Sequence, residues 1–437
     1  MNTLGFRDLS PYEGELTAED EEWLTQVAAI DPRDHRVGIE EDRPYEDEWL
    51  PLVERGPDGR WWAGRFIGSL SFAGRRLTVH PRLGIDVVEA WLDQAFGLVA
   101  PPASARRTET ETFIVRLLAR LWCRAVGTAT RHGLPLLRLP QPHEGLYVRG
   151  RLETRRTLQL ISEGRPQVAS VTYDRSLAHP LTRVLVCAER ALAEQLTDTA
   201  EWRTERVRQV LPPLRAAVGS RPRLPTPYEL SRVRYTPITL PFKGAALLSH
   251  RIASRLGYGA AEEEGAAEGI LVDVAELWEL LIVNCTRRAA SPGMHVEHGT
   301  TGGRRDYLLH SEQGKRGMGR LKPDVLVWRD DRTVAVIDAK YKRLAFSRER
   351  PTGVDQADLY QLAAYANRFE PEGVAALVYP RAGDDGPPAS AEALGPWRAG
   401  AQSFVFERLP TDVAGCREAL SSLIHGRDQL GSAAPAP

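Results

Sequence analysis

The sequence predicts a protein of several domains that mixes the α/β and α+β classes. Its 437 residues are enough for two or three domains, and 42% of them are hydrophobic, which allows a sizeable core. Short alternating apolar segments early in the chain indicate strands, and longer segments with a helical period follow them. We therefore expect a β-rich region over residues 1–100, a mainly helical region over residues 101–255, a mixed domain over residues 256–430 and a disordered tail over residues 431–437.

The N-terminal region combines a hairpin signal with a strongly acidic segment. Residues 61–79 alternate and turn at Ala73-Gly74, as an antiparallel hairpin does. Residues 1–60 hold 6 basic and 17 acidic residues, a balance of −11. This segment should repel nucleic acid, so we interpret it either as a solvated face or as a contact surface for another protein.

The middle region carries two helical patterns and then a change of composition. Amphipathic helices are expected over residues 111–131 and 178–196. Prolines become frequent over residues 212–241, and an acidic segment follows over residues 261–268. Because such a change is typical of the approach to a linker, we place a domain boundary near residues 255–268.

Composition excludes several classes of protein. No apolar run approaches the 18 residues of a membrane span, and the acidic N-terminus is unlike a signal peptide. The four cysteines are widely scattered and have neither zinc-site nor disulfide spacing, which favours a cytoplasmic protein. Gly314-Lys315 is followed by Arg316 instead of Ser or Thr, so the chain lacks a Walker A loop and should not hydrolyse nucleotides by itself.

Two acidic residues and a lysine form the strongest chemical signal. An apolar strand over residues 321–328 contains Asp324, and a second strand over residues 333–341 contains Asp338 and Lys340. If the strands close a hairpin over a loop of about three residues, Asp324 falls opposite Asp338. Alternation places Asp338 and Lys340 on one face. Acids beside buried strands need partners, and a divalent metal ion is the simplest one.

Lysine usage supports a catalytic role for Lys340. Of 57 basic residues only 5 are lysine, and four of these lie within residues 315–342. Arginine is a bulky planar fork and does not replace a compact ammonium at a small metal–phosphate site. We therefore predict that Lys340 takes part in chemistry instead of forming part of a solvated turn.

Helices before and after the hairpin extend the candidate site. The first, which Asp273 is suited to cap, carries Glu279 beside an apolar run. The second, over residues 358–369, places Gln361 and Tyr365 four residues apart on one face. An ordinary amphipathic helix is the alternative interpretation of each of these side chains, and it weighs more for Glu279 than for Gln361 and Tyr365.

The order of helix, acidic hairpin, helix and strand is that of the PD-(D/E)xK restriction-endonuclease-like αβββαβ core. Beyond this core, the chain resembles the McrC family, the nuclease subunit of the McrBC modification-dependent restriction systems, over about residues 5–380. Thr182 stands where that family usually has asparagine. The segments that carry the resemblance, in the family's order, are residues 63–68, 77–82, 147–152, 173–174, 180–185, 277–279, 323–342 and 358–361.

The expected chemistry is metal-assisted hydrolysis of a phosphodiester. Asp324 and Asp338 would hold Mg²⁺, or Mn²⁺, with the Ala339 carbonyl as a further ligand and Glu279 reaching a second position. Oxygen ligands without a Cys/His cluster favour these ions over zinc. Lys340 would orient the attacking water and stabilise charge on the phosphate.

Other residues would position the substrate. Gln361 and Tyr365 would hold water or phosphate, and Lys322 and Lys342 would contact the DNA backbone. Residues 311–350 hold 11 basic and 6 acidic residues, a balance of +5 that should attract nucleic acid.

The resemblance also implies partners. McrC proteins act with an AAA+ GTPase, or a related NTPase, that forms hexameric rings, and the N-terminal region of McrC docks on the ring and stimulates hydrolysis. Recognition of modified DNA lies largely in the partner. The expected function is therefore that of a magnesium-dependent endonuclease subunit, which cleaves modified double-stranded DNA in antiviral defence.

Two other functions fit the sequence. One is a stand-alone PD-(D/E)xK nuclease of repair or of another defence system, which a neighbouring AAA+ gene or a co-purifying NTPase would argue against. The other is a non-catalytic adaptor that stimulates an AAA+ motor. The intact set of Asp324, Asp338 and Lys340 argues against the adaptor.

Overall fold

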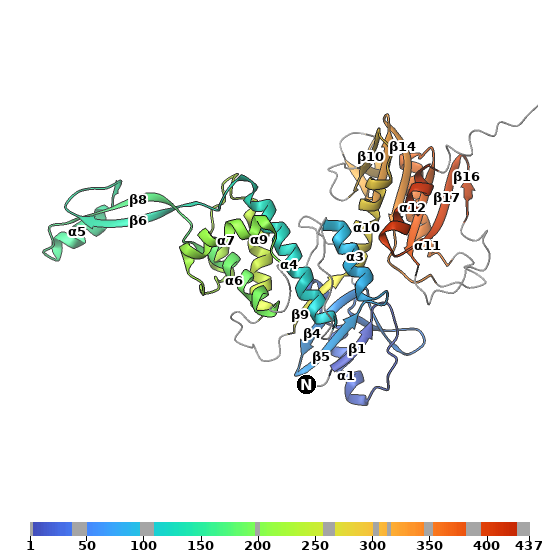
Figure 1. Cartoon of the computed structure of the whole chain (residues 1–437), viewed down its shortest axis with the longest axis horizontal. Helices are drawn as coiled ribbons and strands as arrows, with labels where there is room; N and C mark the ends of the chain where they lie inside the picture. The colour runs from blue at the N-terminus through green and yellow to red at the C-terminus, as the bar shows by residue number, and fades with distance from the viewer. Residues whose placement is uncertain are drawn as a thin grey trace, which may run out of the picture. The chain divides into compact units, whose positions relative to one another are not determined.

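The chain forms two compact units (Figure 1). The first joins the two ends of the chain, residues 1–113 and 265–437, and the second comprises residues 114–264. The predicted regions 1–100 and 256–430 therefore lie largely in one unit, although we expected two separate domains. No helix in the described part of the chain is long and apolar enough to cross a membrane. The computed structural model describes residues 3–36, 50–96, 109–196, 202–256, 267–299, 306–312, 316–344, 353–381 and 395–425.

A four-stranded sheet with the order β1-β5-β4-β9 forms the N-terminal part of the first unit. β4 and β5 form the predicted hairpin, in which Ala73 and Gly74 turn the chain with φ angles of 49° and 73°. The strands of this sheet are β1 (Thr3–Arg7), β4 (Phe66–Phe72), β5 (Arg75–His80) and β9 (Glu268–Asp273). The same part contains β2 (Val53–Arg55), β3 (Trp61–Ala63), α1 (Ala18–Ala28), α2 (Pro32–His35) and α3 (Ile85–Phe96).

Strand β9 lies beyond the predicted domain boundary and pairs antiparallel with β4 of the N-terminal sheet. A side chain on Gly68 of β4 would place its Cβ 2.1 Å from the carbonyl oxygen of Ile270, so only glycine permits this approach. The segment predicted to open the mixed domain thus completes the N-terminal sheet. Pairing between strands so distant in sequence leaves no local pattern from which it could be predicted.

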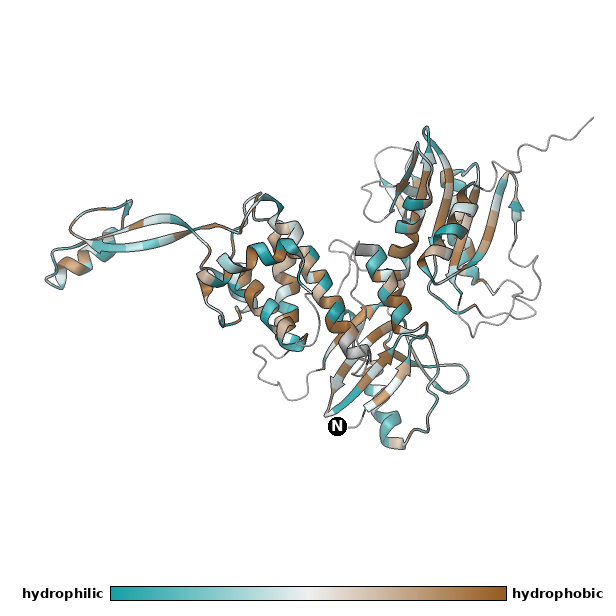
Figure 2. Ribbon diagram, in the orientation of Figure 1, coloured by the Kyte–Doolittle hydropathy of each residue, from teal (hydrophilic) through white to brown (hydrophobic). Residues whose placement is uncertain are grey.

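The C-terminal part of the first unit is built on a mixed sheet with the order β10-β13-β14-β15-β17-β16. Every residue of β15 is buried, and Figure 2 shows hydrophobic stretches along strands of this sheet, as expected where its centre is covered on both faces. The strands are β10 (Met294–Glu297), β13 (Val325–Arg329), β14 (Arg332–Ala339), β15 (Val374–Pro380), β16 (Trp397–Ala399) and β17 (Gln402–Leu409). The helices are α10 (Val274–Ala289), α11 (Gln356–Phe369) and α12 (Val413–His425).

These elements follow the predicted sequence of helix, three strands, helix and strand, as α10, β10, β13, β14, α11 and β15. A two-stranded ribbon of β11 (Asp306–His310) and β12 (Gly317–Leu321) is inserted between β10 and β13. Asp273 caps α10 as predicted and accepts a hydrogen bond of 3.0 Å from the Ala275 amide. Arg65 of the N-terminal part pairs with the same carboxylate at 2.9 Å, so α10 begins where the two parts meet.

Buried side chains join the two parts of the first unit into one core. Trp91 of α3 packs on Trp278 of α10 with ring centroids 5.1 Å apart, and its indole N–H donates to the Thr411 carbonyl at 2.7 Å. The hydroxyl of Tyr341, the residue that follows Lys340, donates to the Asp8 carboxylate at 2.7 Å. The N-terminal sheet therefore packs directly against the chain segment that carries the candidate lysine.

We expect Trp91→Ala to lower the free energy of unfolding of the first unit by about 3–5 kcal/mol, because it removes a fully buried aromatic side chain and its hydrogen bond. Trp397→Ala is the matched control, since Trp397 is 45% exposed on an edge strand and should cost less than about 1 kcal/mol. Denaturant unfolding followed by circular dichroism would measure both. Equal losses in the two variants would contradict the shared core.

The second unit combines helices with a small sheet. The helices predicted over residues 111–131 and 178–196 correspond to α4 and α6, and α4 crosses the boundary between the units. The helices are α4 (Glu109–Ala129), the 3₁₀ turn Thr130–His132, α5 (Thr154–Ser162), α6 (Pro180–Gln195), α7 (Glu205–Val218), α8 (Pro227–Ser231) and α9 (Phe242–Arg255).

The sheet of the second unit was not expected from the sequence. Its order is β6-β8-β7, and β6 (Leu137–Gly145) pairs along its whole length with β8 (Val168–Ser176). β7 (Arg151–Leu152) covers the start of β8. Pro140 and Pro142 lie within β6, and prolines in an apolar alternation argue against a strand. β6 is an edge strand, where a missing backbone N–H is tolerated. The strand was not predicted, because its two prolines are evidence against one.

Two further prolines of this unit lie within a helix. Pro212 and Pro213 lie inside α7, which Thr204 caps. Leu211 and Leu214 of this helix are buried, and their packing offsets the local cost of the prolines. The boundary expected near residues 255–268 agrees with the end of the second unit at residue 264, although these two prolines lie inside a helix.

Candidate metal centre

The β13–β14 hairpin sets the register of the two predicted acids. Val325 lies opposite Ile337, so the next pair outward is Asp324 and Asp338, as predicted. The Ala339 amide donates a hydrogen bond of 2.7 Å to Asp324 Oδ2. This bond fixes the Asp324 carboxylate against the strand that carries the other acid.

The register arises from a shorter turn than expected. Asp330 and Asp331 alone form the turn, with φ angles of 48° and 64°, instead of a loop of about three residues. A bulge between Val327 and Trp328 and their partners on β14 supplies the missing residue. The shorter turn and the bulge offset each other in the register, so Asp324 falls opposite Asp338 as predicted.

Burial makes this group of acids electrostatically costly. Asp324 is 8% exposed and Asp338 is 2% exposed. Burial raises the pKa of Asp324 well above its ordinary value, and the carboxylates of Glu279 and Asp338 raise it further. Burial also raises the pKa of Asp338, although Lys340 opposes this shift. Acids that repel one another inside a protein create a strong preference for a bound cation.

Lys340 is held beside the acids by three side chains. Its Nζ lies 2.7 Å from Asp338 Oδ2 and 3.6 Å from Asp358 Oδ1, and it donates a hydrogen bond of 2.8 Å to Gln361 Oε1. Burial disfavours the charged ammonium, but the attraction of Asp338 and Asp358 outweighs burial and raises the pKa of Lys340. The ammonium therefore stays charged at neutral pH.

Helix α11 brings the predicted glutamine and tyrosine to the same place. The Gln361 amide donates to the Tyr365 hydroxyl at 2.9 Å, and this hydroxyl donates to the backbone carbonyl of Lys322 at 3.0 Å. Together with the bond from Lys340 to Gln361, these contacts form a continuous chain across the site. The chain fixes the orientation of the amide that holds Lys340.

The two predicted DNA-contacting lysines differ in their surroundings. Lys342 is half exposed, and its Nζ lies 2.9 Å from each carboxylate oxygen of Asp358. Lys322 is partly buried directly before the Pro323-Asp324 segment. Asp358 thus contacts both Lys340 and Lys342, a link that the sequence motif alone did not indicate.

Helix α10 and the end of β10 complete the site. Glu279, His298 and Asp324 each offer one ligand atom, and these atoms lie within 4.8 Å of one another. The predicted ligand set had oxygen atoms only and no histidine, and the structure places His298 beside two of the predicted acids. His298 was missed because no motif contains it, and only the following Gly299 hints at a close backbone approach.

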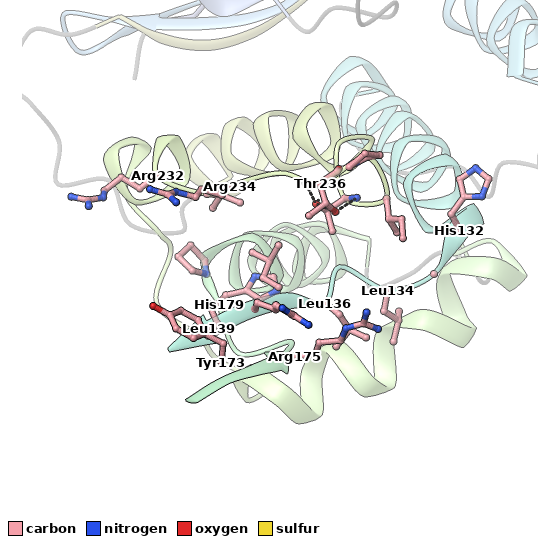
Figure 3. A pocket seen from close by; sticks show the side chains of 18 of the residues that line it. His132, Leu134, Leu136, Leu139, Tyr173, Arg175, His179, Arg232, Arg234 and Thr236 are labelled. Carbon is pink, nitrogen blue, oxygen red and sulfur yellow. Dashed lines mark hydrogen bonds between the residues drawn. The ribbon is translucent and has the colours of Figure 1, made fainter. Parts of the chain in front are cut away.

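A separate cavity of about 970 Å³ lies in the second unit (Figure 3). Leucines and Ile238 line it together with Tyr173, and Arg175, Arg232 and Arg234 give it a positive charge. Among the described residues, Glu279, His298 and Asp324 are the one group of three His, Cys, Asp or Glu side chains with ligand atoms within 4.8 Å of one another, and they lie in the first unit.

Comparisons with known proteins point to one system. A family model described as "McrBC 5-methylcytosine restriction system component" matches residues 62–380. No curated protein matches the chain. A chain from the refined half-complex of the tetradecameric assembly of Thermococcus gammatolerans McrB AAA+ hexamers with bound McrC is similar, with 14% identity and a TM-score of 0.53, over 98% of this chain and 100% of that one. A chain of the cryo-EM structure of the Thermococcus gammatolerans McrBC complex has 16% identity and a TM-score of 0.36, over 66% of this chain and 88% of that one.

Proposed function

The chain belongs to the family of McrBC 5-methylcytosine restriction system components, and from this premise we propose that it is the metal-dependent DNA endonuclease subunit of such a system, of the McrC type. One observation carries the proposal. Asp324 and Asp338 are buried side by side with a charged lysine, Lys340, in a domain whose elements follow the PD-(D/E)xK order. Two acids and an ammonium are the groups that metal-assisted hydrolysis of a phosphodiester requires.

The residues present fit a divalent metal ion. Asp324, Asp338 and Glu279 would hold Mg²⁺ or Mn²⁺, with the Ala339 carbonyl as a further ligand, because buried carboxylates with raised pKa values gain from a cation. A bound ion would supply the charge that offsets the phosphate and favours ionisation of water. Lys340 adds a fixed positive charge for the transition state.

The remaining side chains would hold Lys340 and the DNA. Gln361 and Tyr365 keep the Lys340 ammonium in one position through their chain of hydrogen bonds. The half-exposed Lys342 and the neighbouring Lys322 would contact the DNA backbone, which adds affinity that salt weakens. The carboxylate of Asp358 holds the Lys342 ammonium, so the position of this ammonium is defined before DNA binds.

An AAA+ partner is the second part of the proposal. In the Thermococcus gammatolerans assembly, McrC is bound to McrB AAA+ hexamers, and we infer that this chain likewise binds a hexameric AAA+ NTPase. Apolar side chains that are 70% and 79% exposed, Leu146 and Tyr147, lie between β6 and β7 in the second unit. An exposed apolar patch of this kind marks a contact surface for another protein.

We expect the paired substitution Leu146→Asp and Tyr147→Asp to lower stimulation of the partner's NTPase by more than about tenfold, because central apolar side chains carry most of an interface's binding energy. Met318→Asp, at a residue 67% exposed on β12, should leave stimulation unchanged. The experiment uses the full chain, because a fragment of residues 1–255 would lack β9, which pairs with β4 in the N-terminal sheet. Undiminished stimulation by the double variant would place the interface elsewhere.

The function itself is tested by co-expressing the chain with the NTPase of the adjacent gene. Methylated and unmethylated DNA are then incubated with Mg²⁺ or Mn²⁺ and with GTP or ATP. We expect cleavage of the methylated DNA that requires the partner, the nucleotide and the metal. Cleavage by the chain alone would instead indicate a stand-alone nuclease, and NTPase stimulation without cleavage would indicate an adaptor.

A further inference from the structure

We propose that His298 is a nitrogen ligand of the metal centre and makes the centre prefer Mn²⁺ to Mg²⁺. This inference rests on the proposed function and deepens it by naming the class of metal ion that the nuclease takes. Its basis is geometric, because ligand atoms of Glu279, His298 and Asp324 lie within 4.8 Å of one another. His298 is 3% exposed, so its ring is enclosed at this place.

The fold holds His298 close to Asp324 through its backbone. β10 pairs antiparallel with β13, and Glu297 lies opposite Leu326. Continued by two residues, this register places Gly299 beside Asp324. A Cβ on Gly299 would lie 2.1 Å from the Pro323 carbonyl oxygen, so the two backbones touch and only glycine fits. The position of the imidazole is therefore set by a backbone contact to the segment that carries the acid.

Electrostatics separate this residue from an ordinary core histidine. The charges of Glu279, Asp338 and Lys340 all act on the Asp324 carboxylate. Four carboxylates, those of Glu279, Asp324, Asp338 and Asp358, face the two ammonium groups of Lys340 and Lys342, which leaves an excess of negative charge. A divalent cation bound by Glu279, His298 and Asp324 would satisfy this excess with three protein ligands.

The ligand set then determines which ion binds better. Mg²⁺ prefers an octahedron of oxygen atoms and gains little from an imidazole. First-row transition metal ions accept nitrogen together with oxygen, so one histidine among carboxylates shifts the preference towards them. Asp324 belongs to the set that contains His298 and also to the set of oxygen ligands that contains Asp338. Its carboxylate would therefore serve both sets of ligands.

The test uses the full chain without DNA, with Mn²⁺ and Mg²⁺ as the probes. Calorimetric titration should show tighter binding of Mn²⁺ than of Mg²⁺. His298→Ala should weaken Mn²⁺ binding by about tenfold or more and leave Mg²⁺ binding nearly unchanged. His295→Ala is the matched control, because His295 lies on β10 three residues before His298, is exposed and contacts the Trp328 ring instead. It should change neither affinity.

Electron paramagnetic resonance of bound Mn²⁺ gives a direct readout. A coupling from a directly bound nitrogen should appear in the unaltered chain and in His295→Ala, and it should vanish in His298→Gln. If His298→Ala fails to fold, the spectrum of the unaltered chain still decides. Absence of nitrogen coupling there, or unchanged Mn²⁺ affinity in a folded His298 variant, overturns the proposal.

The outcomes also separate this inference from the nuclease proposal. Asp324→Ala should lose both metal ions in the same titration. Nitrogen-coupled Mn²⁺ in a chain that never cleaves DNA with its partner would sustain His298 as a ligand and refute the nuclease. Metal-dependent cleavage without nitrogen coupling would support the nuclease proposal and refute His298 as a metal ligand.

Discussion

Asp338→Ala should abolish DNA cleavage while the chain stays folded and still binds its partner. Asp338 is 2% exposed and lies 2.7 Å from Lys340, so its removal takes away a metal ligand and the contact that places the ammonium. The loss should exceed about 100-fold, because even groups that only support a metal ligand cost up to that much. Cleavage of modified DNA by the complex with the NTPase is the measurement.

The stability of this variant follows from the same contacts. Burial raises the pKa of Asp338, so the ionised carboxylate costs free energy in the folded chain. Lys340 keeps Asp358 and Gln361 as partners when Asp338 is removed. We therefore expect a melting temperature close to that of the unaltered chain, and Asp338→Asn should behave in the same way.

Asp331→Asn is the control for Asp338→Ala. It removes a carboxylate from the same hairpin, and asparagine tolerates the positive φ of 64° at this turn position. Cleavage should be unaffected. Full cleavage by a folded Asp338→Ala protein would refute the assignment of this hairpin as the active site.

Lys340→Arg should also be inactive, although it keeps the charge. The Lys340 Nζ fits between Asp338 Oδ2 at 2.7 Å and Gln361 Oε1 at 2.8 Å, and its side chain is 16% exposed. The wider guanidinium cannot occupy this space without moving its neighbours, and a displacement of about 1 Å at a reacting centre can cost about 100-fold. Single-turnover cleavage separates this loss from a loss of DNA binding.

Lys342→Arg provides the comparison for the lysine chemistry. Lys342 is half exposed and contacts both oxygens of Asp358, and a guanidinium makes the same two contacts. This variant should retain most of the activity, because a contact to the DNA backbone accepts either cation. Equal behaviour of the two arginine variants would mean that Lys340 is not the catalytic lysine.

Local patterns predicted those elements whose signals lie within one segment. The strand that carries Asp338, the helix cap at Asp273 and the pairing of Gln361 with Tyr365 all follow from periodicity and spacing over a few residues. The strand expected over residues 321–328 begins only at Val325, directly after Asp324. The register of the hairpin was right although the turn is shorter, because a bulge replaces the missing loop residue.

Features that depend on distant segments could not be predicted in this way. His298 reaches the acids through the pairing of β10 with β13, and no spacing in the sequence encodes that pairing. β9 joins a sheet whose other strands lie near the N-terminus. β6 is supported as an edge strand by β8, which overrides the signal of Pro140 and Pro142.

The pairing of β9 with β4 has a consequence for synthesis on the ribosome. The first 113 residues emerge without the strand that covers the edge of β4, and the whole second unit must follow before that strand appears. Because an uncovered strand edge promotes association between chains, the nascent N-terminal part is the stage most exposed to aggregation. The second unit, whose residues are contiguous, should fold first although it is synthesised second, and the first unit is completed last.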